Sequence, residues 1–253
     1  MTATTYHFDD FDLQHFVRVA AEFGQDGYGY VVTPNTDHMI RLHDDPSFRE
    51  LYAGASYILL DSRFLAHFLR VTRGLQLPVC AGSDLTAELF TQVISPDDSL
   101  VLIGGSTEQA RMLTERYRLT RLAHFNPPMG FIRDPDQVEI CLRFVEAHSP
   151  FRFCLLGVGS PQQEALARQL RERGVARGLT LCIGASIDFL TGAERRAPQW
   201  MRLLGIEWLF RLLNNPNRLG RRYLIRGPRI FGVLRKSRVV LRPASESSLR
   251  SLS

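Results

Sequence analysis

Short apolar runs that end in glycine and pass directly into a helical pattern recur along this chain. Four of them, VCAGSD, VLIGGS, CLLGVGS and LCIGAS, begin at residues 79, 101, 154 and 181. Two earlier runs, residues 29–33 and 57–61, end in polar side chains before helical stretches. Strands that alternate with helices at this spacing form a parallel sheet with helices on both faces. We therefore predict an α/β fold, doubly wound around a mostly parallel sheet, with ligands at the carboxyl ends of the strands.

Charge divides the chain near residue 195. Residues 1–194 carry 17 basic and 24 acidic side chains, whereas residues 195–242 carry 13 basic side chains and one acid, Glu207. Basic side chains gathered on one segment are typical of a protein with an anionic partner, such as a phosphate, a nucleic acid or a membrane surface. We therefore divide the chain into an α/β body, residues 1–194, a basic and mostly helical appendage, residues 195–242, and a Ser-rich disordered tail, residues 243–253.

The appendage is also rich in apolar side chains. Residues 199–213 are strongly apolar, and residues 218–242 alternate arginines with aliphatic side chains. This mixture predicts an amphipathic segment at a membrane surface, and the apolar stretch also permits a homo-oligomer. The chain has no apolar run of the roughly 18–20 residues that a bilayer span needs, and its acidic N-terminus is unlike a signal peptide. We expect a cytoplasmic protein.

The segment GVGSPQQE, residues 157–164, follows one of the apolar runs. Gly157 and Gly159 allow backbone amides to approach an anion, and the following helix presents free N–H groups. A structural alternative is equally supported, with Ser160 as the N-cap, Pro161 at the first helical position and Gln163 at the third. The segment lacks the third glycine of a dinucleotide fingerprint, which argues against an NAD-dependent oxidoreductase.

Polar side chains follow two of the predicted strands. Asp61 follows the run of residues 57–60, where its carboxylate either acts as a general base or caps the next helix. Thr33, Asn35 and Asp37 leave the preceding strand in the same way, with a cap and turn as their structural alternative. The seven histidines show no zinc-site spacing, so we predict no metal site.

Taken together, these segments resemble the bacterial WecG/TagA/CpsF glycosyltransferases. The resemblance covers about residues 29–222 and includes TPNTD at 33–37, Asp61, GSDL at 82–85, GVGSPQQE at 157–164, IGASIDF at 183–189, RAPQW at 196–200 and GIEWLFRL at 205–212. It implies a Rossmann-like, inverting hexosyl- or N-acetylhexosaminyltransferase of polysaccharide biosynthesis. Such an enzyme transfers a sugar from a UDP-sugar to a polyprenyl-diphosphate-linked saccharide, without a metal or other cofactor, while bound peripherally to the inner face of the cytoplasmic membrane.

The resemblance also implies roles for individual residues. Asp61 is the expected catalytic base. The expected substrate-binding residues are Thr33, Asn35, Asp37, Gly82, Asp84, Gly157, Gly159, Ser160, Gln163, Asp188 and Arg196. The expected contacts to the diphosphate and the membrane are Arg211, Arg218, Arg221 and Arg222. The chain departs from the family pattern at Ser62, where many members have glycine, and at Val79, where many have arginine.

The chemistry of an inverting transfer fits this composition. The reaction needs a base on one side of the sugar and stabilisation of the departing diphosphate on the other. A guanidinium binds a diphosphate in a bidentate manner, and Lys236 is the only lysine of the chain. The alternative is a nucleotide-binding α/β protein whose basic tail binds nucleic acid. Tyr223 and Phe231 are too few for base stacking, however, and the repeated aliphatic side chains favour lipid over nucleic acid.

Overall fold

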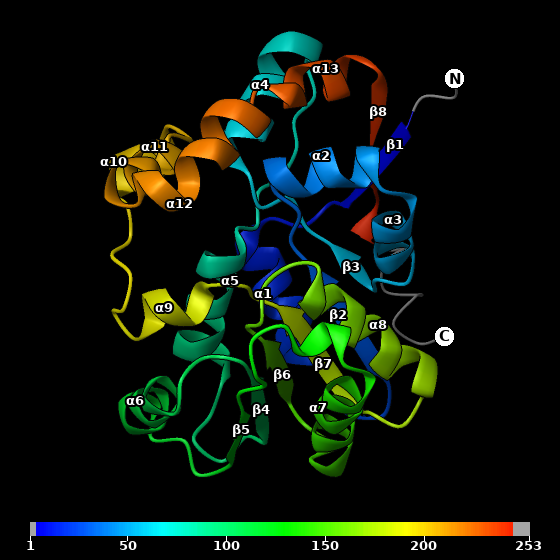
Figure 1. Ribbon diagram of the computed structural model, residues 1–253, viewed down its shortest axis with the longest axis vertical. Helices are drawn as coiled ribbons and strands as arrows, with labels where there is room; N and C mark the ends of the chain where they lie inside the picture. Colours follow the sequence, from blue (N-terminus) through cyan, green and yellow to red (C-terminus); the bar gives the residue numbers. More distant parts are fainter. Residues whose placement is uncertain (1–3, 245–253) are drawn as a thin grey trace.

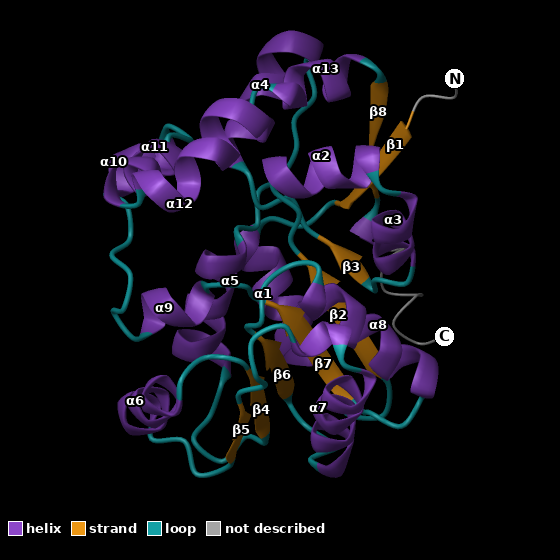
Figure 2. Ribbon diagram, in the orientation of Figure 1, coloured by secondary structure: helices purple, strands orange, loops and turns teal. Residues whose placement is uncertain are grey.

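The structure, a computed structural model, describes residues 4–244 apart from the side chains of Arg218 and Arg222. Six parallel strands form the central sheet in the order β3-β2-β7-β6-β4-β5 (Figures 1 and 2). Their bounds are β2 Tyr28–Val32, β3 Tyr57–Ile58, β4 Leu100–Ile103, β5 Leu122–Phe125, β6 Phe153–Leu156 and β7 Gly178–Cys182. The predicted α/β fold with a parallel sheet is confirmed.

Helices cover both faces of this sheet, which explains why its strands are continuous apolar runs. One face packs against α3 (Pro46–Ala53), α7 (Pro135–Ala147) and α8 (Gln162–Arg173). The other packs against α1 (Leu13–Glu22), α5 (Gly82–Glu88) with the π-helix η1 (Leu89–Val93), α6 (Thr107–Tyr117) and α9 (Ser186–Leu190). A short 3-10 helix, η2 (Phe131–Arg133), precedes α7. The carboxyl ends of the strands face α2 (Thr36–Asp44) and the helices of the appendage, residues 195–242 (Figure 1).

Two strand predictions need correction, and the strand at the edge of the sheet was not predicted. Residues 79–81 form no strand, although the N–H of Cys80 donates to the carbonyl of Leu60 at 2.9 Å. Strand β3 stops at Ile58 instead of continuing to Asp61, because Pro34, which follows β2, has no N–H for the ladder. The N–H of Asp61 still donates to the carbonyl of Pro34 at 3.1 Å. The edge strand β5 was not predicted, since its side chains are only partly buried and the segment has no continuous apolar run.

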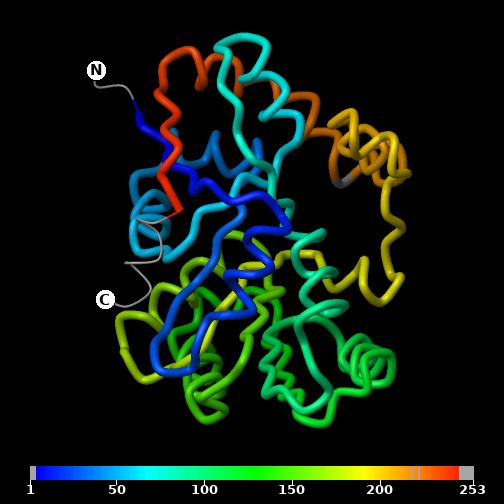
Figure 3. The backbone as a smooth tube through the Cα atoms, turned by 180° about the vertical axis from the view of Figure 1, so that it is seen from behind, coloured from blue at the N-terminus to red at the C-terminus, as the bar shows by residue number. Residues whose placement is uncertain are grey.

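A second, two-stranded sheet joins the two ends of the described chain. Strand β1 (Thr4–Asp9) pairs in parallel with β8 (Ser237–Arg242), and Figure 3 shows them side by side. Arg242 also binds the buried Asp9 at 2.9 Å. The last part of the predicted amphipathic segment, residues 237–242, is therefore a strand that is attached to the body.

The rest of the appendage is helical, as predicted. It contains α10 (Gln199–Leu203), α11 (Glu207–Asn214), α12 (Pro216–Gly220), the π-helix η3 (Arg221–Arg226) and α13 (Arg229–Arg235). Helix α13 buries Ile230, Val233 and Leu234 and places Phe231 against Phe64 and Phe68 of α4 (Arg63–Arg73). Among the described residues, no helix combines the length and apolar character needed to cross a membrane. Most of the predicted disordered tail, residues 245–253, lies outside the described residues.

Candidate active site

A cavity of about 340 Å³ lies between the carboxyl ends of β2 and β3 and the appendage. The body contributes residues within 35–40, 61–64 and 81–83, and the appendage contributes residues within 202–231. One part of the wall is polar, with Asn35, Asp61, Glu207 and Arg211 among its residues. The other part is apolar, with Phe64, Trp208, Ile230 and Phe231. The cavity therefore fits a ligand that has both a polar and an apolar part.

Asp61 lies on the polar wall, just beyond the end of β3. Its Oδ1 accepts a hydrogen bond from the N–H of Gly82 at 2.9 Å, and the side chain of Asn35 hydrogen-bonds to the same carboxylate. It does not cap the next helix, because Ser62 accepts the N–H of Leu65 at the start of α4. The capping alternative for Asp61 is therefore wrong, and its carboxylate faces the cavity.

The protonation of Asp61 depends on both parts of the chain. Burial raises its pKa above the usual aspartate value, and the negative charge of Glu207 raises it further. The N–H of Gly82 and the positive charge of Arg211 act in the opposite direction. A carboxylate with a raised pKa at a cavity wall is a suitable general base.

The predicted residues Thr33, Asn35, Asp37 and Gly82 lie around Asp61. Asn35 is the N-cap of α2, and its Oδ1 accepts the N–H of Asp37 at 3.1 Å, so the predicted structural alternative is confirmed for this residue. The side chain of Asn35 also contacts Asp61. Gly82 packs so closely against Thr33 that a Cβ at this position would lie 2.7 Å from the threonine hydroxyl. Asn35 and Asp37 line the cavity.

The appendage adds a pair of charged residues that extends over the cavity. Glu207 Oε1 accepts hydrogen bonds from Nη2 and Nε of Arg211, at 2.6 and 3.0 Å. The guanidinium of Arg211 also lies 4.9 Å from the ring centroid of Phe189 on α9. Glu207 was not among the predicted site residues. The sequence signal that could have identified Glu207 is its position as the one acid of the basic segment 195–242.

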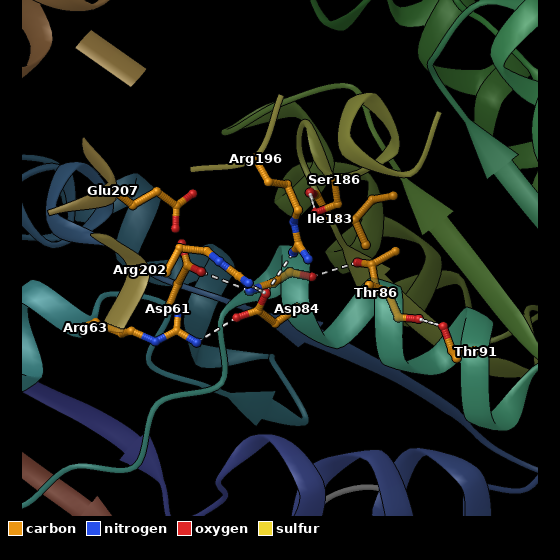
Figure 4. A network of polar contacts seen from close by, with 12 residues as sticks. Asp61, Arg63, Asp84, Thr86, Thr91, Ile183, Ser186, Arg196, Arg202 and Glu207 are labelled. Carbon is orange, nitrogen blue, oxygen red and sulfur yellow. Dashed lines mark hydrogen bonds and ion pairs between the residues drawn. The ribbon is translucent and has the colours of Figure 1, made fainter. Parts of the chain in front are cut away.

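Asp84 is buried beside the cavity and does not belong to its lining. Its carboxylate binds Arg63 at 2.7 Å, Arg196 at 2.8 Å and Arg202 at 3.0 Å (Figure 4). Burial alone would raise the pKa of Asp84, but the hydrogen bond and charge of Arg63, with the charges of Arg196 and Arg202, outweigh it and hold the pKa below its usual value. Arg63 and Arg202 line the cavity and were not predicted as site residues.

The GVGSPQQE turn does not line this cavity. Gln163 is buried, and its Oε1 accepts the N–H of Gly184 at 2.9 Å. The capping interpretation of the turn is wrong, because α8 begins at Gln162 without a side-chain cap and Ser160 Oγ accepts instead from Arg41 at 3.5 Å. Gly157 and Gly159 belong to the same turn.

The remaining predicted residues lie in different places. Asp188 accepts a hydrogen bond from Gln109 at 2.7 Å and is not part of the cavity lining. Of the four predicted arginines, Arg211 lines the cavity and Arg221 is exposed on η3. The side chains of Arg218 and Arg222 lie outside the described part of the chain. Among residues 4–244, no group of three or more His, Cys, Asp and Glu side chains is arranged to hold a metal ion.

Comparison with known protein families assigns nearly the whole chain to one of them. The model of the family described as "Glycosyl transferase WecG/TagA/CpsF family" matches residues 1–243, which include the body, the appendage and every residue of the cavity.

Proposed function

The chain belongs to the WecG/TagA/CpsF family of glycosyl transferases, and from that premise we propose that it transfers a sugar from a UDP-sugar to a polyprenyl-diphosphate-linked saccharide, with inversion at the anomeric carbon. One observation carries this proposal. Asp61 lies in a cavity that the appendage closes with Glu207 and Arg211, so a candidate base and a candidate cation share one site.

Asp61 has the position that the base of such a transfer requires. We propose that its carboxylate takes the proton of the acceptor hydroxyl while the hydroxyl oxygen bonds to the anomeric carbon. The bond from that carbon to the UDP oxygen breaks at the same time, and the diphosphate keeps the electron pair. Arginines stabilise the negative charge that develops on the departing diphosphate. In this proposal they take the place of a metal ion.

The two parts of the cavity wall support an acceptor that carries a lipid. A saccharide suits the polar wall around Asn35, Asp61 and Glu207. An isoprenoid chain suits the apolar wall of Phe64, Trp208, Ile230 and Phe231. We propose that the acceptor binds with its sugar at Asp61 and its lipid toward α13.

The transfer itself is tested by incubating the full-length protein with a lipid-diphosphate-linked monosaccharide and a panel of UDP-sugars. We expect one donor to release UDP with formation of the disaccharide product. A chain that is folded and binds UDP but transfers no sugar from any donor of the panel contradicts the proposed function.

Exposed apolar side chains of the appendage support binding to the inner face of the membrane. On α10 and just after it, Trp200, Leu203 and Leu204 are 58%, 62% and 62% exposed. Leu224 and Ile225 on η3 are 62% and 67% exposed, next to the exposed Arg221 and Arg226. The aliphatic residues of α13 are largely buried, so we propose that residues 200–226, instead of the outer end of the appendage, contact the lipid.

Replacing Trp200, Leu203 and Leu204 together by serine is expected to weaken binding to anionic phospholipid vesicles at least tenfold, because each large apolar side chain gains about 1.5–3 kcal/mol on full burial. Co-sedimentation with vesicles measures the effect. The control carries serine at the exposed Met129, Ile140 and Val175, which lie just before η2, on α7 and just after α8. Figure 1 shows α7 at the other end of the molecule from α10. Equal loss in both variants contradicts the proposed surface. Truncation after Arg195 is a poorer test, because it removes β8 and the buried residues of α13.

A further inference from the structure

Three arginines share one carboxylate beside the cavity. Arg63 comes from the first turn of α4, Arg196 from the loop after α9 and Arg202 from α10, and all three bind Asp84 (Figure 4). The side chain of Asp84 is only 9% exposed. One carboxylate offsets one of the three positive charges, so the cluster keeps a surplus of two.

This surplus borders the cavity. Arg63 and Arg202 both contribute to its wall, whereas Asp84 lies behind them. The Nε of Arg202 is buried and has no hydrogen-bond partner among the described residues. A buried donor of this kind is costly unless a ligand accepts from it.

The other acids of the cavity wall have other partners. Glu207 is bound to Arg211, and Asp37 lies 4.0 Å from Arg41. The remaining acid of the wall is Asp61, which is held by Gly82 and Asn35. The cavity therefore has a carboxylate of raised pKa on one part of its wall and two arginines with surplus charge on another.

We propose that Arg63 and Arg202, held in place by Asp84, form a binding site for a diphosphate group. Asp84 accepts from Nη2 of Arg63 and Nη1 of Arg202, which leaves the other N–H groups of both guanidiniums for a ligand. Planar guanidiniums bind the non-bridging oxygens of a diphosphate through paired hydrogen bonds. The inference rests on the proposed function, in which both the donor and the lipid-linked acceptor carry a diphosphate.

Binding to the full-length protein tests the site without any transfer reaction. Isothermal titration with UDP and with farnesyl diphosphate distinguishes a nucleotide diphosphate from an isoprenyl diphosphate. We expect Arg63→Gln and Arg202→Gln each to weaken binding of one of these ligands about tenfold, or about 1.4 kcal/mol. The matched control is Arg70→Gln, because Arg70 is an exposed arginine on the same helix and lies outside the wall of this cavity.

If both glutamine variants bind UDP and farnesyl diphosphate within twofold of the unchanged protein, the site does not exist. If a glutamine variant fails to fold, Arg63→Lys and Arg202→Lys replace it, because lysine keeps the charge beside Asp84 but loses the paired hydrogen bonds. We then expect weaker binding with an unchanged melting temperature, and unchanged affinity overturns the proposal. A protein that binds a diphosphate through these arginines but transfers no sugar contradicts the proposed function alone.

Discussion

Replacing Asp61 by asparagine is expected to slow sugar transfer by about 10²–10⁴-fold, the usual contribution of a positioned general base. Asparagine keeps the size of the side chain and an oxygen that can accept the N–H of Gly82, so the fold around β3 and α5 is preserved. It cannot take a proton from the acceptor hydroxyl. The release of UDP in the presence of donor and acceptor measures the rate, and the melting temperature reports the fold.

The control for Asp61→Asn is Asp136→Asn, an exposed aspartate in the first turn of α7. We expect no change in rate for this variant. The pH dependence provides a second check. Because burial raises the pKa of Asp61, the deprotonated base is lost at a higher pH than for an ordinary aspartate, and the transfer rate should fall on the acidic side of that raised pKa. A normal rate for Asp61→Asn contradicts the assignment of Asp61 as the base.

The central sheet could be predicted because its strands are buried on both faces. Continuous apolar runs such as Leu100–Ile103 and Phe153–Leu156, each followed by glycine and a helical pattern, indicate parallel strands. The pairing of β1 with β8 could not be predicted in the same way. It joins residues from opposite ends of the chain. Strand β8 also has no continuous apolar run, because buried and exposed residues are mixed along it and arginines interrupt it.

The site was predictable only in part, for a similar reason. Asp61, Asn35 and Asp37 follow strands in the sequence, so their place at the end of the sheet follows from the order of the strands. The network around Asp84 depends on contacts between α5, α4 and the appendage, and no local pattern specifies them. The resemblance implied that Asp84 binds substrate, and the three arginines around its carboxylate could not be read from the sequence.

The same network determines how the appendage is attached beside the site. Arg196 and Arg202 come from the loop before α10 and from α10, and Asp84 comes from the body. The ion pairs therefore hold the start of the appendage against α5. Loss of the carboxylate would leave three guanidiniums close together with no acid between them.

Replacing Asp84 by asparagine is expected to lower the free energy of unfolding by about 3 kcal/mol. This value is the lower end of the range for breaking a buried ion pair, and we choose it because the three arginines retain some contact with water. Urea denaturation measures the change. The control is Glu139→Gln, since Glu139 also binds two arginines, Arg143 and Arg173, but on the surface. A much smaller loss is expected there.

The pH dependence of this loss follows from the lowered pKa of Asp84. A carboxyl whose pKa is lower in the folded state stabilises the fold above its unfolded pKa, about 3.9, and loses this contribution as the pH falls through the folded value. The difference in free energy of unfolding between the unchanged protein and Asp84→Asn should therefore be full near neutral pH and should shrink below about pH 4. A difference that is no larger than that of Glu139→Gln, or that stays constant down to acid pH, would show that the charge of Asp84 does not hold the appendage in place.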